Sequence, residues 1–288
     1  MIKILVPVNF SDYSINALSY ALTLSEKFQA GITILHCFSD YASRDIDPDN
    51  PNTEEPMLPD IERHDRESQE RLKKLTNKVI TNMSSLQNKN IHIEYRFEYG
   101  YPEEVITQIS KSMRSDVIIM GTSSKNDPIK QAMGSVTGDV INRTKALVLA
   151  VPANSRVNHL KIGNILFLME ETDRDFITLH RLIRITKPFN TRIYAVYHTA
   201  NKEDKKDQRR IEEMRRYCEN NCKHQPIEFS PITGKNFVAT IKTYAKNNQI
   251  DLITMSSHKR TILKKFFTPS VTKKMLYETD VPLLIFQS

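Results

Sequence analysis

The sequence predicts an α/β protein built from two tandem copies of one fold, each an open parallel sheet of five strands with helices on both faces. In each half, short runs rich in Ile, Val and Leu alternate with segments of helical periodicity, which is the pattern of a parallel sheet with helical crossovers. The two halves also match each other: residues 116–124 and 133–137 align with residues 251–259 and 268–272 at a constant offset of 135. A chain of 288 residues is long enough for two domains of ordinary size.

The expected strands are short, and several are apolar throughout, as strands buried on both faces of a sheet are. In the first half they are Ile2–Val8, Ile32–Phe38, Ile91–Phe97, Val117–Met120 and Leu147–Val151. In the second half they are Ile165–Met169, Ile193–His198, Ile227–Ser230, Leu252–Met255 and Leu283–Phe286.

The expected helices of the first half fall between its strands, at Tyr13–Phe28, Asp60–Leu86, Pro102–Met113 and Ser135–Arg143. Pro102 stands in the first turn of its helix, where its missing N–H costs nothing. In the second half, the charged run Asn201–Arg216 has Ile211 and Met214 as its main apolar residues. We interpret this run as a solvated helix in preference to a partner surface.

The boundary between the halves is expected near residues 155–160, within a polar segment that starts at Pro152, so the domains are residues 1–155 and 160–288. Matching residues of the two copies are 161 positions apart in the early part of each copy and 135 positions apart in the later part. The second copy is therefore 26 residues shorter than the first. Most of the missing stretch corresponds to Ser39–Pro59, whose four prolines exclude a regular helix or strand. An inert crossover loop is favoured here over a flap near a site.

Composition is that of a globular protein, with 39% hydrophobic and 26% charged residues. No run of eighteen apolar residues is present, so no membrane span is expected. The first residues enter a strand pattern at once and lack the features of a secretory signal. Three cysteines do not make a disulfide framework. The expected location is therefore cytoplasmic.

Charge is distributed unevenly: residues 1–151 carry a net charge of −3 and residues 152–288 carry +10. A basic half can attract nucleic acid, anionic lipid or an acidic partner. A solvated surface is the favoured interpretation. Nucleic acid is not expected, because neither an aromatic stacking motif nor a helix-turn-helix pattern is present.

A phosphate-binding loop is indicated between Gly121 and Thr137. Gly121 directly follows an expected strand, where a glycine permits a sharp turn and a close approach of phosphate. Gly134 and Ser135 begin the next helix, and a helix N-terminus offers free N–H groups to an anion. The loop is neither a P-loop nor a G-x-G-x-x-G fingerprint, and the spacing alone leaves a plain turn with a helix cap equally open. The second copy has Ser256 and Pro269 at the glycine positions, so we expect one site and not two.

The pattern Gly121-x2-Ser124-x9-Gly134-Ser135 resembles the ATP-binding motif G-x2-G-x9-G-[S/T] of the universal stress protein family. Three further segments resemble that family: Ile4–Leu18, Gly100–Ile106 and Leu147–Pro152. The resemblance covers nearly the whole chain in two tandem copies, and it is more specific in the first copy than in the second.

The resemblance implies a sheet of order 3-2-1-4-5 in each copy, with ATP or another adenine nucleotide, with or without Mg²⁺, bound between strands 1 and 4. It implies these site residues: Val8 and Asn9 facing adenine and ribose, Cys37 giving main-chain contacts to adenine, Met120 and Gly121 flanking ribose and phosphates, and Ser124, Gly134, Ser135, Val136 and Thr137 in the phosphate loop. The chain has Asn9 where the family usually has Asp, and Ser124 at the second glycine of the motif.

The final strands of both copies, Leu147–Val151 and Leu283–Phe286, are apolar and lie at expected sheet edges, where exposed strands invite pairing. In the family that the chain resembles, such edges join two subunits. We therefore expect the two halves to pair as a pseudo-dimer within one chain. A protein partner and a further homodimer are left open.

Cys218, Cys222 and His224 are the one cluster with a metal-like pattern, since the two cysteines stand one helical turn apart. Core packing is favoured for these cysteines, and no metal site is expected. The expected function is an adenine-nucleotide-binding stress-response or regulatory protein with little or no turnover. Two alternatives are a nucleotide-free interaction scaffold and an α/β nucleotide hydrolase or transferase. No catalytic residue is assigned, because no nucleophile–base pair is evident.

Overall fold

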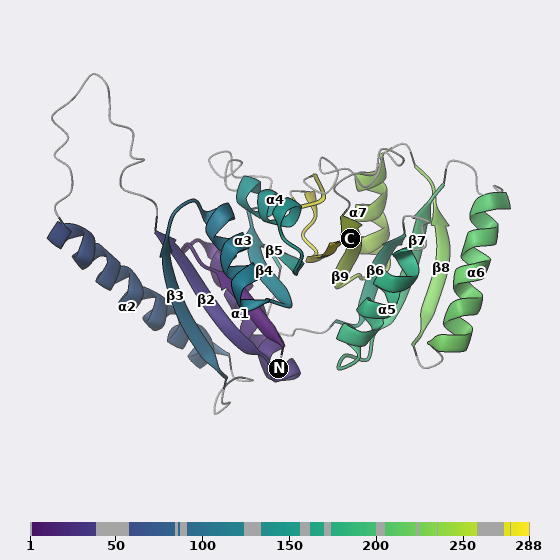
Figure 1. Ribbon diagram of the computed structural model, residues 1–288. Helices are drawn as coiled ribbons and strands as arrows, with labels where there is room; N and C mark the ends of the chain where they lie inside the picture. The colour runs from purple at the N-terminus through teal and green to yellow at the C-terminus, as the bar shows by residue number, and fades with distance from the viewer. Residues whose placement is uncertain are drawn as a thin grey trace, which may run out of the picture.

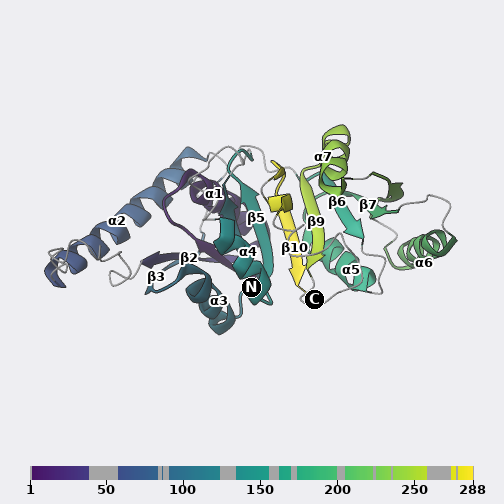
Figure 2. The same ribbon diagram turned by 90° about the horizontal axis from the view of Figure 1, so that it is seen from above.

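A computed structural model of the chain describes residues 2–38, 58–83, 86, 91–123, 134–155, 162–169, 174–199, 205–222, 225–234, 236–257, 274–276 and 278–287. These residues form one twisted sheet with helices packed on both of its faces (Figures 1 and 2). The expected segment 39–59 falls almost wholly outside the described residues, as do residues 156–161 between the halves.

The first half contains five strands and four helices among its described residues. The strands are β1 (Lys3–Pro7), β2 (Gly31–Phe38), β3 (Ile93–Tyr99), β4 (Val117–Thr122) and β5 (Leu147–Pro152). The helices are α1 (Asp12–Phe28), α2 (Leu58–Asn82), α3 (Pro102–Met113) and α4 (Gly134–Arg143). Helix α2 ends four residues before the expected Leu86, which is nevertheless buried in the core after a short turn.

The second half repeats this order. Its strands are β6 (Asn164–Met169), β7 (Arg192–His198), β8 (Ile227–Ile232), β9 (Leu252–Ser257) and β10 (Leu283–Gln287). Its labelled helices are α5 (Arg174–Thr186), α6 (Lys205–Asn221) and α7 (Phe237–Asn247). The charged helix α6 buries Ile211 and Met214, the main apolar residues of the expected helix.

The ten strands form one continuous sheet of order β3-β2-β1-β4-β5-β10-β9-β6-β7-β8. Within each half the order is the expected 3-2-1-4-5, and all pairs within a half are parallel. The halves meet through an antiparallel pair of β5 and β10. The expectation of edge pairing is thus confirmed, and the two expected sheets are in fact joined into one.

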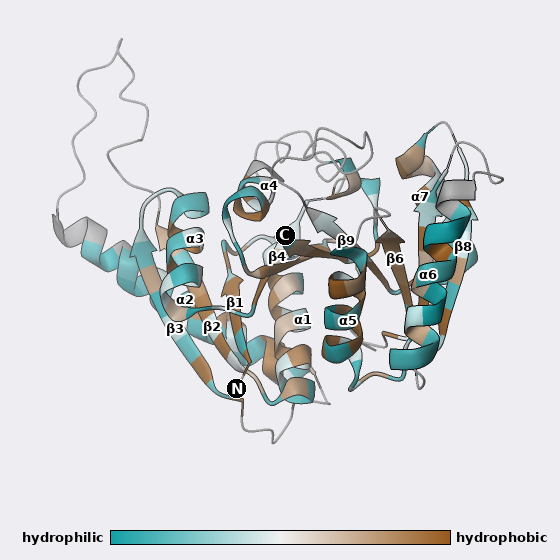
Figure 3. Cartoon of the chain, turned by 45° about the vertical axis from the view of Figure 1, so that its right-hand side comes forward, coloured by the Kyte–Doolittle hydropathy of each residue, from teal (hydrophilic) through white to brown (hydrophobic). Residues whose placement is uncertain are grey.

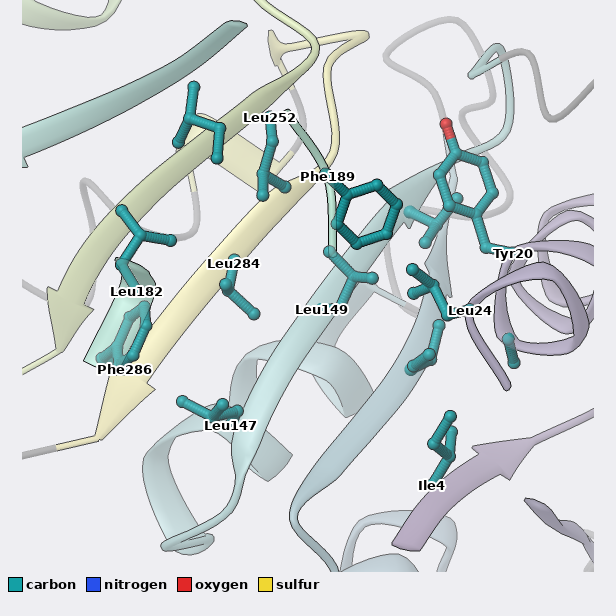
Figure 4. Close-up of a cluster of buried hydrophobic side chains, with 14 of the residues drawn as sticks. Ile4, Tyr20, Leu24, Leu147, Leu149, Leu182, Phe189, Leu252, Leu284 and Phe286 are labelled. Atoms are coloured by element: carbon teal, nitrogen blue, oxygen red, sulfur yellow. The ribbon is translucent and has the colours of Figure 1, made fainter. Parts of the chain in front are cut away.

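One hydrophobic core runs across the junction of the two halves. Helices α1, α2, α5 and α6 cover the same face of the sheet, and their buried side chains form one cluster with the inner residues of both halves. Figure 3 shows α1 and α5 side by side over the middle of the sheet. Figure 4 shows Leu149 and Leu284 on the paired strands, with Leu24 of α1 and Phe189, from the turn after α5, close by. The opposite face carries α3, α4 and α7 over two smaller clusters.

Local sequence explains where α1 begins and ends. Ser11 is its N-cap, and the Ser11 hydroxyl accepts a hydrogen bond from the Ser14 N–H, which satisfies one of the free donors of the first turn. Gln29 ends the helix in a left-handed conformation, the usual geometry of a helix C-terminus.

Among the described residues, no helix combines the length and apolar character that crossing a bilayer requires.

Candidate functional site

The candidate site lies at the carboxyl ends of β1, β2 and β4, which are neighbours in the sheet. The Val8 N–H, just past the end of β1, donates to the Leu35 carbonyl of β2 at 2.8 Å. His36 Nδ1 donates to the Val8 carbonyl at 2.7 Å, and both side chains are buried. The end of β1 is therefore held firmly against β2. In open α/β sheets, ligands bind at this edge, where neighbouring connections diverge to opposite faces.

Asn9 follows immediately, and its exposed side chain organises the turn into α1. Its Oδ1 accepts hydrogen bonds from the Ser11 hydroxyl at 2.6 Å and the Ser11 N–H at 3.3 Å. Its Nδ2 donates to the Tyr13 hydroxyl at 3.2 Å. Each of the two polar atoms of the amide thus already has a partner within the loop. Because the oxygen already accepts two hydrogen bonds, recognition of a ribose or an adenine by Asn9 would use the second amide hydrogen.

Gly121 lies inside β4, which continues through Thr122, so the sharp turn expected at this glycine is wrong. The structure gives a different reason for the glycine. A Cβ at this position would collide with the Tyr13 carbonyl oxygen and would lie 2.8 Å from the Ser14 nitrogen. The first turn of α1 therefore packs directly against the bare backbone of β4. Met120, the preceding residue, is buried with Leu5 on the other face of the sheet.

Helix α4 begins at Gly134, one residue before the expected start, and its first turn docks on the end of β4. Thr137 is buried, and its hydroxyl lies 3.5 Å from the Gly121 carbonyl oxygen, at the limit of a hydrogen bond. Val136 beside it is half-buried. The two ends of the loop, 122 and 134, are therefore held near each other, with the helix N-terminus at the carboxyl edge of the sheet. Ser124 and the side chain of Ser135 lie outside what the structure describes.

Thr122 is a residue of this edge that sequence reasoning missed. It is the last residue of β4, its side chain is only 3% exposed, and its hydroxyl has no hydrogen-bond partner among the described residues. Burying an unpaired hydroxyl costs on the order of 1–3 kcal/mol. A polar group from a ligand in the adjacent loop would satisfy it. No sequence signal marked this residue, since a threonine at the end of a strand is common.

Cys37 is half-buried near the end of β2, opposite Glu98 of β3. Burial, with smaller contributions from the nearby carboxylates of Glu98 and Glu103, raises the pKa of its thiol to about 12. The thiol therefore stays protonated and unreactive at neutral pH. Its expected contribution to a site, which is through main-chain atoms, does not depend on the thiol.

Phe10 is the second residue of the site that the sequence did not indicate. It adopts a left-handed backbone conformation with φ of 62°, which is uncommon for a bulky residue. Its ring contacts His36, with 4.8 Å between ring centroids, and the Arg71 guanidinium of α2 lies 4.3 Å from its centroid. This stack closes the side of the site that faces α2. Arg71 and Phe10 are far apart in the sequence, and no local pattern links them.

The second repeat differs at the equivalent edge. Ser256 of β9 replaces Gly121, is buried, and its hydroxyl lies 3.2 Å from the Thr178 hydroxyl of α5. The extra atoms of Ser256 are accommodated there by a side-chain contact to the helix. Glu170, Lys259, Pro269 and Ser270 lie outside the described residues. In the second repeat, a contact between two side chains thus stands where the first repeat has helix backbone against Gly121.

A cavity of about 840 Å³ occurs elsewhere, between α1 and α5 over the paired strands β5 and β10. Tyr20, Leu24, Phe189 and Leu284 are among its mostly apolar lining residues. It lies at the junction of the halves and touches none of the residues at the carboxyl ends of β1 and β4. We therefore treat it as separate from the candidate site.

A duplicated sheet of order 3-2-1-4-5, with a helix N-terminus at the carboxyl edge of its fourth strand, defines a tandem α/β protein with one candidate anion site. The model of the universal stress protein family matches residues 1–152 and 162–287, and the chain belongs to this family.

Individual proteins resemble the chain in sequence or in fold. A universal stress protein of Methanocaldococcus jannaschii is 28% identical over 150 residues, which are 52% of this chain and 81% of that protein. The crystal structure of a universal stress protein from Archaeoglobus fulgidus matches with a TM-score of 0.71 at 18% identity, covering 99% of this chain and 98% of that one. A functionally unknown protein from Pseudomonas aeruginosa matches with a TM-score of 0.57 at 12% identity, covering 99% and 92%. The two structural likenesses concern the fold.

Proposed function

We propose that this protein binds an adenine nucleotide at a single site in its first repeat and acts as a regulatory, stress-response module with little or no turnover. The observation that carries the proposal is the meeting of the N-terminus of α4 with the end of β4, through Thr137 and Gly121. A helix N-terminus presents free N–H groups and the positive end of the helix dipole, which favour phosphate. The motif residues Gly121, Ser124, Gly134 and Ser135 lie at or between these two ends.

The unpaired Thr122 hydroxyl supports the same site, because a bound ligand would supply its missing partner. Val8, Asn9 and Cys37 supply the neighbouring strand ends, where the adenine and ribose would lie. The further assignments of Met120, Ser135 and Val136 to the nucleotide, and of the domain limits 1–155 and 160–288, belong to this proposal.

The test is calorimetric titration of ATP, AMP and cyclic AMP into the nucleotide-stripped protein, with and without Mg²⁺, for the parent and for Gly134→Pro. Proline is tolerated at the first position of a helix, so the variant should fold while losing one N–H donor of the site. We expect the affinity of the variant to fall at least tenfold, which corresponds to about 1.4 kcal/mol. Pro269→Gly in the second repeat is the matched control and should change neither affinity nor stoichiometry. Equal affinity in parent and Gly134→Pro would sink the assignment of the loop.

A second candidate function is a nucleotide-free interaction scaffold, and two observations favour it. Gly121 is required by the packing of α1 on β4 even without a ligand. The Asn9 amide is already engaged by Ser11 and Tyr13. Protein purified without added nucleotide separates the two functions: co-purifying adenylate released on denaturation supports the first. No adenylate, together with no heat of binding for any of the three nucleotides, supports the scaffold.

A further inference from the structure

Cys218 and Cys222 form a pair at the C-terminal end of α6, at the far end of the sheet from the candidate nucleotide site (Figure 1). Helix α6 ends at Asn221, and the Cys222 N–H still donates to the Cys218 carbonyl at 2.7 Å, in the manner of a last helical turn. Cys218 is buried and Cys222 is half-buried. The two side chains therefore lie on the same face of the helix, one turn apart.

Both cysteines open onto a cavity of about 500 Å³ between the end of α6 and strand β8. The remaining lining residues are Arg215, Glu219, Gln225, Ile227, Glu228 and Phe229. Burial, with a smaller contribution from the neighbouring Cys222 thiol, raises the pKa of Cys218 to about 12, and burial also raises the pKa of Cys222. Both groups are thus protonated thiols at neutral pH, one helical turn apart and lining the same cavity.

The spacing of the pair decides what it can bind. Residues four apart on a helix have their Cβ atoms about 5–6 Å apart. A disulfide requires a Cβ–Cβ distance of about 3.5–4.5 Å, so direct oxidation would distort the end of α6. A bridging ion with metal–sulfur bonds of about 2.3 Å each spans up to about 4.6 Å between two sulfurs. The geometry therefore suits a bridging atom better than a direct sulfur–sulfur bond.

The number of ligands narrows the class of ion. Within the described part of the chain, no three His, Cys, Asp or Glu side chains gather closely enough to hold a metal. Structural zinc takes four protein ligands, so the described residues do not build a zinc site here. Soft ions such as Cu(I) prefer thiolate ligands and accept two of them.

We propose that Cys218 and Cys222 form a dithiol site for a soft, thiophilic ion that takes two ligands, of the class represented by Cu(I). On binding, each thiol loses its proton to solvent, two metal–sulfur bonds form, and no electrons are transferred. Since two protons are released, affinity should increase about a hundredfold for each unit of rising pH below the pKa of the thiols. This site is independent of the nucleotide proposed for the first repeat.

The experiment uses the full-length reduced protein, with Ag⁺ as a redox-silent probe, and native mass spectrometry in excess glutathione. A monothiol competitor removes ions held by one sulfur, whereas a chelating pair keeps its ion because the second bond forms at high effective concentration. We expect one Ag⁺ per chain, with two protons displaced. The adduct should disappear in Cys222→Ser and remain in Cys37→Ser, which is the matched control because Cys37 lies alone on β2.

A second measurement needs no variant. Phenylarsine oxide condenses with two neighbouring thiols, forming two arsenic–sulfur bonds and releasing water, and peptide mapping should place the adduct across Cys218 and Cys222. The proposal is overturned if the parent holds no Ag⁺ against glutathione, if Cys222→Ser holds it equally well, or if the arsenical maps elsewhere. A 218–222 disulfide forming readily under mild oxidation, in place of ion binding, would overturn it as well.

Discussion

Leu149 of β5 lies directly opposite Leu284 of β10, its own counterpart in the second repeat. The flanking pairs are reciprocal under the same repeat offset: Leu283 with Ala150, and Ile285 with Val148. This is the register of a twofold interface in which one surface patch meets its own copy. The chain thus contains within itself the kind of contact that two identical subunits make, and the junction is stabilised by both ladder hydrogen bonds and buried leucines.

Leu284→Lys should uncouple the two halves. The substitution places an ammonium group at a position only 6% exposed, facing the apolar core of the junction, where a charge is costly. We expect a loss of roughly 3–5 kcal/mol at the junction, which is large for a single substitution. Calorimetry should then show two melting transitions in place of one. Leu284→Met, which conserves volume, is the control and should melt as the parent does.

Gly121→Ala should destabilise the protein in the absence of any nucleotide. The added methyl group meets the backbone of Tyr13, which cannot move without shifting α1. Overpacking of this kind costs about 1–3 kcal/mol. Ser256→Ala in the second repeat is the paired variant and should cost only about 1 kcal/mol, for its hydrogen bond with Thr178. Urea unfolding measures the free energy of unfolding of both variants. Equal losses of stability in Gly121→Ala and Ser256→Ala would show that the α1–β4 contact is looser than the structure indicates.

Phe28 and Phe189, counterparts at the early repeat offset of 161, should be energetically coupled across the junction. Their rings meet edge to face, with 5.6 Å between centroids. A double-mutant cycle with both residues changed to Leu should give a coupling energy of about 0.5–1.5 kcal/mol. Phe28→Leu combined with Phe97→Leu on β3 is the control and should be additive. Additivity in both pairs would argue against a rigid contact at the junction.

Tyr20 should make the stability depend on pH in the alkaline range. Burial raises its pKa from 10.0 to about 12, with a smaller opposing effect of a hydrogen bond to Ser155. The folded state therefore keeps the Tyr20 proton to a higher pH than the unfolded chain does. The contribution of the neutral, buried phenol to the free energy of unfolding is complete below pH 10 and is lost as pH rises from 10 to 12. Over that range, the unfolding free energy of the parent should fall relative to that of Tyr20→Phe, by up to about 2.7 kcal/mol. A constant difference from pH 8 to 11.5 would contradict the assignment.

Much of the fold was predictable because its signals are local. Strand β4 and helix α3, for example, follow from an apolar run and from Pro102 at a helix start. Most boundaries moved by one or two residues, as at β3, which begins at Ile93 and not at Ile91, whereas α2 ends four residues before the expected Leu86. The order of strands within each half came from the family resemblance, since strand pairing is a contact between residues distant in the sequence.

The candidate site was predictable only in outline. Val8, Gly121 and Thr137 lie at one edge of the sheet, and their role as nucleotide ligands, which the family resemblance implied, stays a prediction. The buried Thr122 hydroxyl and the left-handed Phe10 gave no signal, because each depends on what surrounds it in space. The same holds for the reason behind Gly121: the motif marked the glycine, but only the packed helix shows which atoms would collide with a side chain.

By itself the sequence determined the alternation of strands and helices, the duplication of the fold and the loss of both glycines in the second copy. These features depend on periodicity and residue identity, which the sequence contains directly. The tertiary structure alone decided that the two halves share one sheet with Leu149 opposite Leu284, and that α1 rests on bare backbone at Gly121. It also decided that Cys218 and Cys222 share a cavity with β8. Such contacts join residues far apart in the chain, and their energies depend on distances that only the packed core sets.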